Sequence, residues 1–84
     1  MRNYAPEYSQ AALDALLAGS GRRRVEARRA IERLCRILPK EGDFTVRDDS
    51  GRTWSVTLFD SVVLTYWIDH AACEVKIGLI EWVN

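Results

Sequence analysis

The stretch that decides the fold of this 84-residue chain is VVLTYWID HAA CEVKIGLIEWV, residues 62–83. Apolar residues stand at every second position of both its runs: Leu64, Tyr66 and Ile68 in the first, Val75, Ile77 and Leu79 in the second. Side chains of a strand point alternately to its two faces, so each run predicts a β-strand with one apolar face. Because only residues 70–72 separate the runs, we expect them to pair as an antiparallel hairpin.

Two further alternating runs precede this hairpin. They consist of Phe44, Val46 and Asp48, and then of Trp54, Val56 and Leu58. The segment Asp49-Ser50-Gly51 between them is typical of a turn, because glycine adopts a positive φ without steric cost. A second short turn at residues 60–61 leads into the next run. Four strands joined by such short connections predict an antiparallel meander sheet.

The N-terminal half has a helical period instead. Its first apolar stripe consists of Ala12, Leu13, Leu16 and Leu17, at spacings of three and four residues. Pro6-Glu7 is typical of a helix start, since proline fits the first helical position and an early acid complements the positive end of the helix. At the other end of this helix we expect Gly19 to adopt the left-handed conformation.

A second helix is predicted from Arg22 to Leu38. Ser20 is positioned to accept a hydrogen bond from its first amides, and Pro39 ends it. Its inner face consists of small and apolar residues: Val25 or Ala27, then Ala30, Ile31, Leu34, Cys35 and Leu38. Because residues 19–21 are the whole connection between two amphipathic helices, they predict an antiparallel helical hairpin.

The sequence therefore predicts an α+β protein in which this helical hairpin packs on one face of a four-stranded antiparallel meander sheet. Residues 2–5 are an open candidate for a short N-terminal edge strand, which would give the order β-α-α-β-β-β-β. The length, with no linker, repeat or low-complexity segment, indicates a single domain at residues 1–84.

The composition excludes several classes of protein. A hydrophobic fraction of 48% and a charged fraction of 29% are typical of a globular domain and not of a disordered chain. The first residues lack the apolar core of a signal peptide, and no apolar run is long enough to cross a membrane, so we expect a cytoplasmic protein. Two cysteines, Cys35 and Cys73, are too few for a secreted disulfide scaffold, and whether they pair stays open.

The charge is unevenly distributed, although twelve basic and twelve acidic residues cancel. Residues 22–40 hold eight basic and two acidic residues, a local charge of +6. The outer face of the second helix consists of arginines: Arg22, Arg29, Arg33 and Arg36. Such a face is either a solvated surface with intrahelical ion pairs or a surface that binds a partner. We interpret these four arginines as candidate partner-binding residues.

The sequence contains no phosphate-binding glycine loop, no CxxC pair and no HExxH motif. With His70 as its single histidine, in a predicted turn, we expect no metal site and no cofactor. The acidic candidates for proton transfer stand at strand ends and turns, where we expect solvated carboxylates: Asp60, Asp69, Glu74 and Glu81.

Basic and aromatic residues are expected to converge on the second face of the sheet. This set consists of Arg47, Arg52, Lys76, Trp67 and Trp82. Basic groups beside aromatic rings are able to hold phosphate and stack a base, which would make this face an RNA-binding surface. Exposed tryptophan is also common in protein interfaces, so a contact with another protein or a homodimer contact is the alternative.

Several segments resemble the RelE/ParE superfamily of toxins. YAPEY (residues 4–8) followed by ALDAL (residues 12–16) is similar to the short strand, helix start and Asp-Leu pair that open those proteins. Residues 63–77 are similar to their penultimate hairpin: an apolar pair, a Tyr, an Ile, an Asp, a turn and a Val-rich strand. Gly51-Arg52, ahead of Trp54, is similar to the glycine and basic residue that open their middle strand. The resemblance covers nearly the whole chain in order and length.

This resemblance implies the toxin of a type II toxin–antitoxin pair, which is bound by a cognate antitoxin and acts by mRNA cleavage on the ribosome or by inhibition of DNA gyrase. Ribonuclease members carry basic residues on the middle strands and an Arg, His or Tyr near the C-terminus. Residues 53–64 of this chain contain no basic residue. The chain ends in Glu81-Trp82-Val83-Asn84, without an Arg, His or Tyr among these last four residues. The candidate catalytic residues that remain for a metal-independent endoribonuclease are Arg47, Arg52, Tyr66, Lys76 and Glu81.

The alternative from a different class is a protein-interaction module without enzymatic activity. It would use the Trp-bearing sheet face or the arginine-rich helix, either as a homodimer or with another protein as its partner.

Overall fold

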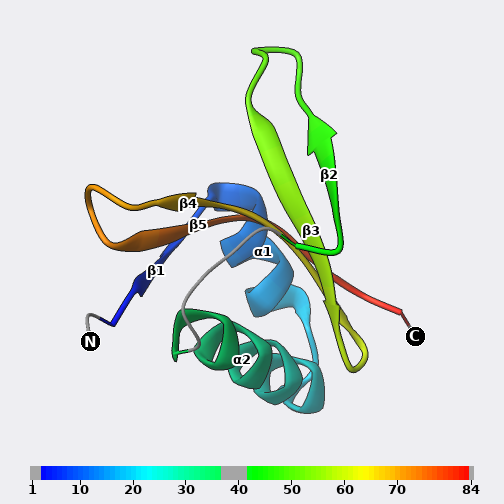
Figure 1. Ribbon diagram of the computed structural model, residues 1–84. Helices are drawn as coiled ribbons and strands as arrows, with labels where there is room; N and C mark the ends of the chain where they lie inside the picture. The colour runs from blue at the N-terminus through cyan, green and yellow to red at the C-terminus, as the bar shows by residue number, and fades with distance from the viewer. Residues whose placement is uncertain (1–2, 37–41, 84) are drawn as a thin grey trace.

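A computed structural model describes residues 3–36 and 42–83 of the chain. The elements along the chain are β1 (Ala5–Tyr8), α1 (Gln10–Ala18), α2 (Gly21–Arg36), β2 (Phe44–Arg47), β3 (Thr53–Phe59), β4 (Val62–Asp69) and β5 (Glu74–Trp82). This is the predicted α+β order β-α-α-β-β-β-β. Figure 1 shows α2 packed below the twisted sheet, and the β2–β3 hairpin extending away from the helices.

All five strands form one sheet in the order β1-β5-β4-β3-β2. The meander of β2, β3, β4 and β5 is antiparallel, as predicted. The predicted N-terminal edge strand is present as β1, at residues 5–8 instead of 2–5. It pairs parallel to β5, so the sheet as a whole has five strands and is mixed. A meander leaves the outer edge of its last strand with unpaired N–H and C=O groups, and pairing with β1 satisfies them.

The first helix begins later than predicted, because Pro6 and Glu7 belong to β1. A proline is tolerated there since β1 is an edge strand: the amide of Ala5 donates to Cys73 just before β5 and that of Ser9 donates to Ile77, so position 6 faces the free edge. Ser9 caps α1, its Oγ accepting from the Ala12 amide at 3.0 Å. The same hydroxyl donates to the carbonyl of Gly78 at 2.7 Å and so joins the start of α1 to β5.

The connection between the helices is partly as predicted. Gly19 has φ −73° and ψ 155°, so the predicted left-handed cap is wrong, and its amide donates to the Ala15 carbonyl at 3.1 Å. This extended backbone carries the chain directly into the next cap. There the prediction is confirmed, because Ser20 Oγ accepts from the Arg23 amide at 3.2 Å. The predicted helix end at Leu38 and Pro39 lies outside the described residues.

The core lies between the two helices and one face of the sheet. Its buried members are Ala12 of α1, Ala27, Ala30, Ile31, Leu34 and Cys35 of α2, Val62, Leu64 and Tyr66 of β4, and Val75, Ile77 and Ile80 of β5. Of the two alternatives for the inner face of α2, Ala27 is fully buried, whereas Val25 is 48% exposed. Small residues on the helices bring them close to a sheet face that supplies the larger side chains.

A β-bulge decides which residues of β5 face the helices. Residues 66 and 65 of β4 pair with residues 77 and 79 of β5, so Gly78 is an extra residue in the ladder. The alternation therefore shifts by one position, which brings Ile80 to the core. The expectation that Leu79 shares a face with Ile77 is wrong: Leu79 lies on the other face and is 39% exposed.

Candidate functional site

The sheet face opposite the helices is not covered by the described part of the chain, and we call it the open face. The strand registers place on it Phe44, Val46, Trp54, Val56, Leu58, Val63, Thr65, Trp67, Asp69, Glu74, Lys76, Leu79 and Glu81. Three of its apolar side chains are about half exposed: Phe44 at 59%, Leu58 at 54% and Val46 at 45%. A sheet face with such exposed apolar groups is typical of a binding surface.

Trp54 is the centre of this face. A β-carbon at Gly78 would lie 2.5 Å from Trp54 Cζ3, so the indole packs directly on the bare backbone of β5. The indole Nε1 donates to Asp48 Oδ2 at 2.8 Å, which fixes the direction of the ring. Trp54, Arg47 and Leu79 contribute to the lining of a shallow cavity of about 550 Å³ beside it.

Asp48 organises the turn that leads to Trp54. Its Oδ1 accepts from the amides of Ser50 and Arg52 at 2.9 and 3.0 Å, and from the Ser50 hydroxyl at 2.7 Å. The hydrogen bonds from the Ser50 hydroxyl and the Trp54 indole lower the pKa of Asp48 from 3.8 to about 2. The predicted positive φ of this turn is confirmed at Gly51, with φ 88°. Asp48 is therefore an ionised structural acceptor at neutral pH.

Two of the predicted site cations lie beside Trp67. The guanidinium carbon of Arg52 is 3.9 Å from the centre of the Trp67 ring, which is a close cation–π contact. Lys76 is the register partner of Trp67 on β5. The structure therefore brings Arg52, Trp67 and Lys76 to the same region of the open face, as the sequence predicts.

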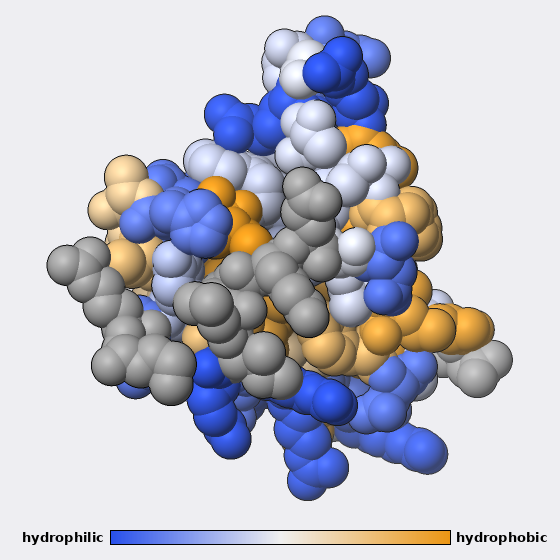
Figure 2. All heavy atoms as spheres, in the orientation of Figure 1, coloured by the Kyte–Doolittle hydropathy of each residue, from blue (hydrophilic) through white to orange (hydrophobic). Residues whose placement is uncertain are grey.

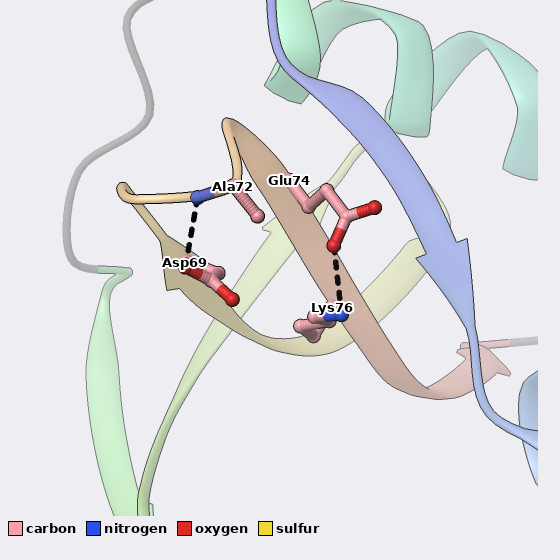
Figure 3. Close-up of polar contacts among 4 residues, drawn as sticks. All are labelled: Asp69, Ala72, Glu74 and Lys76. Carbon is pink, nitrogen blue, oxygen red and sulfur yellow. Dashed lines mark hydrogen bonds and ion pairs between the residues drawn. The ribbon is translucent and has the colours of Figure 1, made fainter.

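Acidic residues surround the lysine of this group. Lys76 Nζ forms an ion pair with Glu74 Oε1 at 2.8 Å, and the nearby Asp69 accepts from the Ala72 amide at 3.1 Å (Figure 3). The hydrogen bond to Glu74 raises the pKa of Lys76, and the charges of Glu7 and Asp69 act in the same direction. Lys76 is therefore a protonated cation that is paired with Glu74, and its raised pKa makes it a poor base.

The other catalytic candidates do not join this group. Tyr66 is 1% exposed on the helix side of the sheet, where its hydroxyl lies 3.3 Å from Thr57 Oγ1 and burial raises its pKa. Glu81 is exposed and lies five residues along β5 from Lys76, roughly 17 Å away. Arg47 ends β2 at the rim of the cavity. General acid–base catalysis needs both groups within hydrogen-bond reach of one substrate, and this spacing does not provide it.

Trp82 lies on the helix side, so its predicted convergence with Trp67 is wrong. Its Nε1 donates to the carbonyl of Arg23 at 3.1 Å, and the Arg23 guanidinium lies 5.6 Å from the ring centre. The cause is the bulge at Gly78, which reverses the alternation after that residue. Trp82 thus connects the end of β5 to the start of α2.

Sequence reasoning missed the cluster of Asp48, Trp54 and Gly78. Two signals pointed to it. An isolated glycine inside a strand pattern indicates a bulge or the close approach of another group. An aspartate at the start of a turn accepts from amides that follow it. The sequence did not predict that Trp54 is the side chain that packs on Gly78, because Trp54 belongs to a strand that is not adjacent to β5.

The predicted arginine face of α2 is present. Arg22, Arg29, Arg33 and Arg36 are all exposed. In Figure 2 hydrophilic side chains gather along the lower edge of the molecule, where Figure 1 places α2. Their role in partner binding stays a prediction.

The single histidine and the two cysteines lie in turns or in the core, and not in the group formed by Arg52, Trp67 and Lys76. His70 Nδ1 lies 2.7 Å from the Tyr4 hydroxyl, which joins the N-terminal segment to the β4–β5 turn. Cys35 and Cys73 are not joined in a disulfide: Cys35 is buried, which raises its pKa, and Cys73 has φ 54° in the turn before β5. Among residues 3–36 and 42–83, no group of three His, Cys, Asp or Glu side chains is placed to hold a metal ion. Within the same residues no helix is long and apolar enough to span a membrane.

Comparison with solved structures places this arrangement among known folds. A chain of the RelBE2 toxin–antitoxin complex of Mycobacterium tuberculosis matches with a TM-score of 0.74 and 18% identity over 96% of this chain and 99% of that one. A chain of the Escherichia coli RelBE complex matches with a TM-score of 0.61 and 11% identity over 96% and 98%. A chain of the Pyrococcus horikoshii RelE–RelB complex matches with a TM-score of 0.58 and 15% identity over 99% of this chain and 98% of that one.

The chain has the fold of RelE toxins. No protein-family model and no curated protein matches the sequence. The resemblance carried by residues 4–16 and 63–77 is thus confirmed by the structural matches at the level of the fold. In this RelE-like fold, the strand at residues 5–8 that opens the chain is β1, and the hairpin at residues 63–77 is formed by β4 and β5.

Proposed function

We propose that this chain is the toxin of a type II toxin–antitoxin pair and that a cognate antitoxin binds it. The observation that carries the proposal is the match of the fold, over nearly the full length of both chains, to chains of three RelE–RelB complexes. The exposed apolar side chains of the open face, such as Val46 and Leu58, supply surface for a protein partner.

Of the two actions that the resemblance implies, the site favours inhibition of a target by binding, as in a block of gyrase, over mRNA cleavage. Cleavage without a metal needs groups that take the 2′-hydroxyl proton, stabilise the phosphate oxygens and protonate the leaving oxygen. Arg52 is available for the phosphate, but Lys76 is paired with Glu74 and Tyr66 is buried on the other face. Binding needs no such alignment of proton donors and acceptors.

Expression of the chain alone from an inducible promoter tests the toxin assignment. We expect growth arrest, and rescue when the protein encoded by the adjacent reading frame is co-expressed. Normal growth at high expression would contradict the assignment.

The purified chain, added to a gyrase supercoiling assay and to an in vitro translation reaction, then separates the two actions. We expect inhibited supercoiling and intact mRNA, whereas cleaved mRNA would overturn the preference for binding.

A homodimeric interaction module is the second candidate, and the edge of the sheet favours it. β2 is an edge strand whose four residues are all exposed, with Phe44 at 59%. Such an edge pairs readily with another strand, including its copy in a second chain. Sedimentation velocity at several protein concentrations tests this candidate. A dimer that Phe44→Ser converts to a monomer would support it, and a monomer at every concentration would contradict it.

A further inference from the structure

The outer face of α2 carries a row of like charge. At 3.6 residues per turn, Arg22, Arg29, Arg33 and Arg36 fall within about 60° of one another around the helix axis, and they span roughly 21 Å along it. We call these four residues the arginine row. Arg29, Arg33 and Arg36 are four and three positions apart, a spacing that places β-carbons about 5–6 Å from each other, and Arg22 lies two turns before Arg29 on the same line.

The acidic residues of α2 do little to neutralise this row. Glu32 lies 3.9 Å from Arg36, but both side chains are mostly in solvent, at 57% and 77% exposed, where such a pair is weak. Glu26 accepts a hydrogen bond from Ser61 at 2.7 Å, which directs its carboxylate toward the β3–β4 turn. The positive charge of the row therefore remains available to a partner.

The row also lacks the apolar centre that a protein interface normally needs. The only large apolar side chain of α2 that is exposed among the described residues is Val25, and the ring of the half-buried Phe59 lies beside the row, 5.9 Å from the guanidinium carbon of Arg33. Protein interfaces are organised around buried aromatic or aliphatic anchors, with charge at the rim. Contacts to a nucleic-acid backbone are instead dominated by charge, and the planar fork of arginine matches the geometry of phosphate oxygens.

We propose that the arginine row binds the phosphodiester backbone of a nucleic-acid duplex without reading its sequence. All seven basic residues of α2 are arginines, none a lysine, which suits bidentate phosphate contacts. The row lies on the helix, away from the open face, so this contact and the binding of a protein partner on the open face do not compete for the same residues. The inference concerns the purified chain and does not depend on its toxicity.

Fluorescence anisotropy with a short labelled RNA duplex, and in a second arm with a DNA duplex of the same length, tests the proposal. We expect the logarithm of the association constant to fall linearly with the logarithm of the salt concentration, with a slope of about −3 to −4 for four phosphate contacts. Arg22→Gln with Arg29→Gln should weaken binding roughly tenfold at low salt and flatten the slope by about 2. Binding of either duplex in this way supports the phosphodiester contact, and the two arms identify which backbone is preferred.

The matched control is Arg24→Gln with Arg28→Gln, which removes the same charge from the same helix but from outside the row. Both double variants should retain the circular dichroism and unfolding midpoint of the parent chain. An equal loss of affinity in the two double variants would overturn the proposal, because net charge alone would then explain binding. Binding of polyglutamate through the row, with no binding of either duplex, would overturn it in favour of an acidic protein partner.

Discussion

The indole of Trp54 lies directly over Gly78, so that a β-carbon at residue 78 would come within 2.5 Å of the ring. The two residues are not on neighbouring strands, since β4 separates β3 from β5. The same glycine accepts a hydrogen bond from Ser9 at the start of α1 and is the extra residue of the bulge. One missing side chain therefore permits the ring to pack on the open face, while the bulge directs the end of β5 toward the helices.

We expect Gly78→Ala to destabilise the protein by about 1–3 kcal/mol, because the added methyl group meets a ring whose direction is fixed by Asp48. Urea unfolding measures the loss, and the tryptophan emission should shift to the red as the ring leaves its site. Gly21→Ala is the control, since a β-carbon there meets nothing within 4 Å. If Gly78→Ala and the parent chain have the same midpoint and the same emission, the contact does not exist in solution.

A pH titration isolates the contribution of Asp48. Its pKa is about 2 in the folded chain and 3.8 in an unperturbed carboxyl group. A group whose pKa is depressed on folding contributes stability that is complete above the unfolded value and is lost as the pH falls through the folded value. Asp48→Asn should therefore lower stability at neutral pH, and its difference from the parent chain should disappear between about pH 4 and pH 2.

Chemical denaturation at a series of pH values measures this difference. Asp49→Asn is the control, because its carboxylate stands in the same turn without the hydrogen bonds of Asp48 to Ser50 and Trp54 among the described contacts. A difference between the Asp48 variant and the parent chain that is constant from neutral pH to pH 2 would show that the hydrogen bonds do not act through the ionised carboxylate.

The meander was predictable from the sequence because its strands alternate with a clear period, and β4 begins and ends where residues 62–69 predict. The position of Trp82 was not, because the alternation of a single strand does not show a bulge that only pairing reveals. β1 was misread for a related reason. Proline restricts φ to a value that suits both a helix start and an edge strand, and the free edge of β5 decides between them.

Some features of the candidate site were predictable from the sequence and others were not, for the same reason. Trp67 and Lys76 meet because they are register partners on β4 and β5, where the register follows from the alternation, and Arg52 reaches Trp67 from the residue just before β3. The ion pair of Lys76 with Glu74 was not predictable, since residues 74 and 76 share a face in any strand and the sequence does not say whether their side chains bond. The arginine face of α2 was predictable in full because helical periodicity alone defines it.

Tyr66→Phe separates a structural role of this residue from a catalytic one. Its hydroxyl contacts Thr57 at 3.3 Å in the core, so we expect a loss of about 1 kcal/mol or less in the free energy of unfolding and unchanged growth inhibition. Tyr66→Ala removes the largest fully buried side chain and should cost about 3–5 kcal/mol. Growth inhibition abolished by Tyr66→Phe in a folded, soluble variant would instead assign the hydroxyl a direct role in the activity.

Trp82→Ala should lower stability without changing association, because the ring packs on α2 and not on the open face. The ring is partly buried against Arg23, so we expect a loss of about 2 kcal/mol, somewhat below that of a tryptophan enclosed in a core. Trp82→Phe keeps most of the packing but removes the indole hydrogen bond, and should cost about 1 kcal/mol. Trp67→Ala is the contrasting variant on the open face: it removes a half-buried ring and the stacking of Arg52, and we expect a loss of about 1–2 kcal/mol in the free energy of unfolding. Urea unfolding and sedimentation velocity on the three variants check these expectations. A Trp82→Ala variant with full stability and a changed sedimentation coefficient would place this ring in an intermolecular contact instead of against α2.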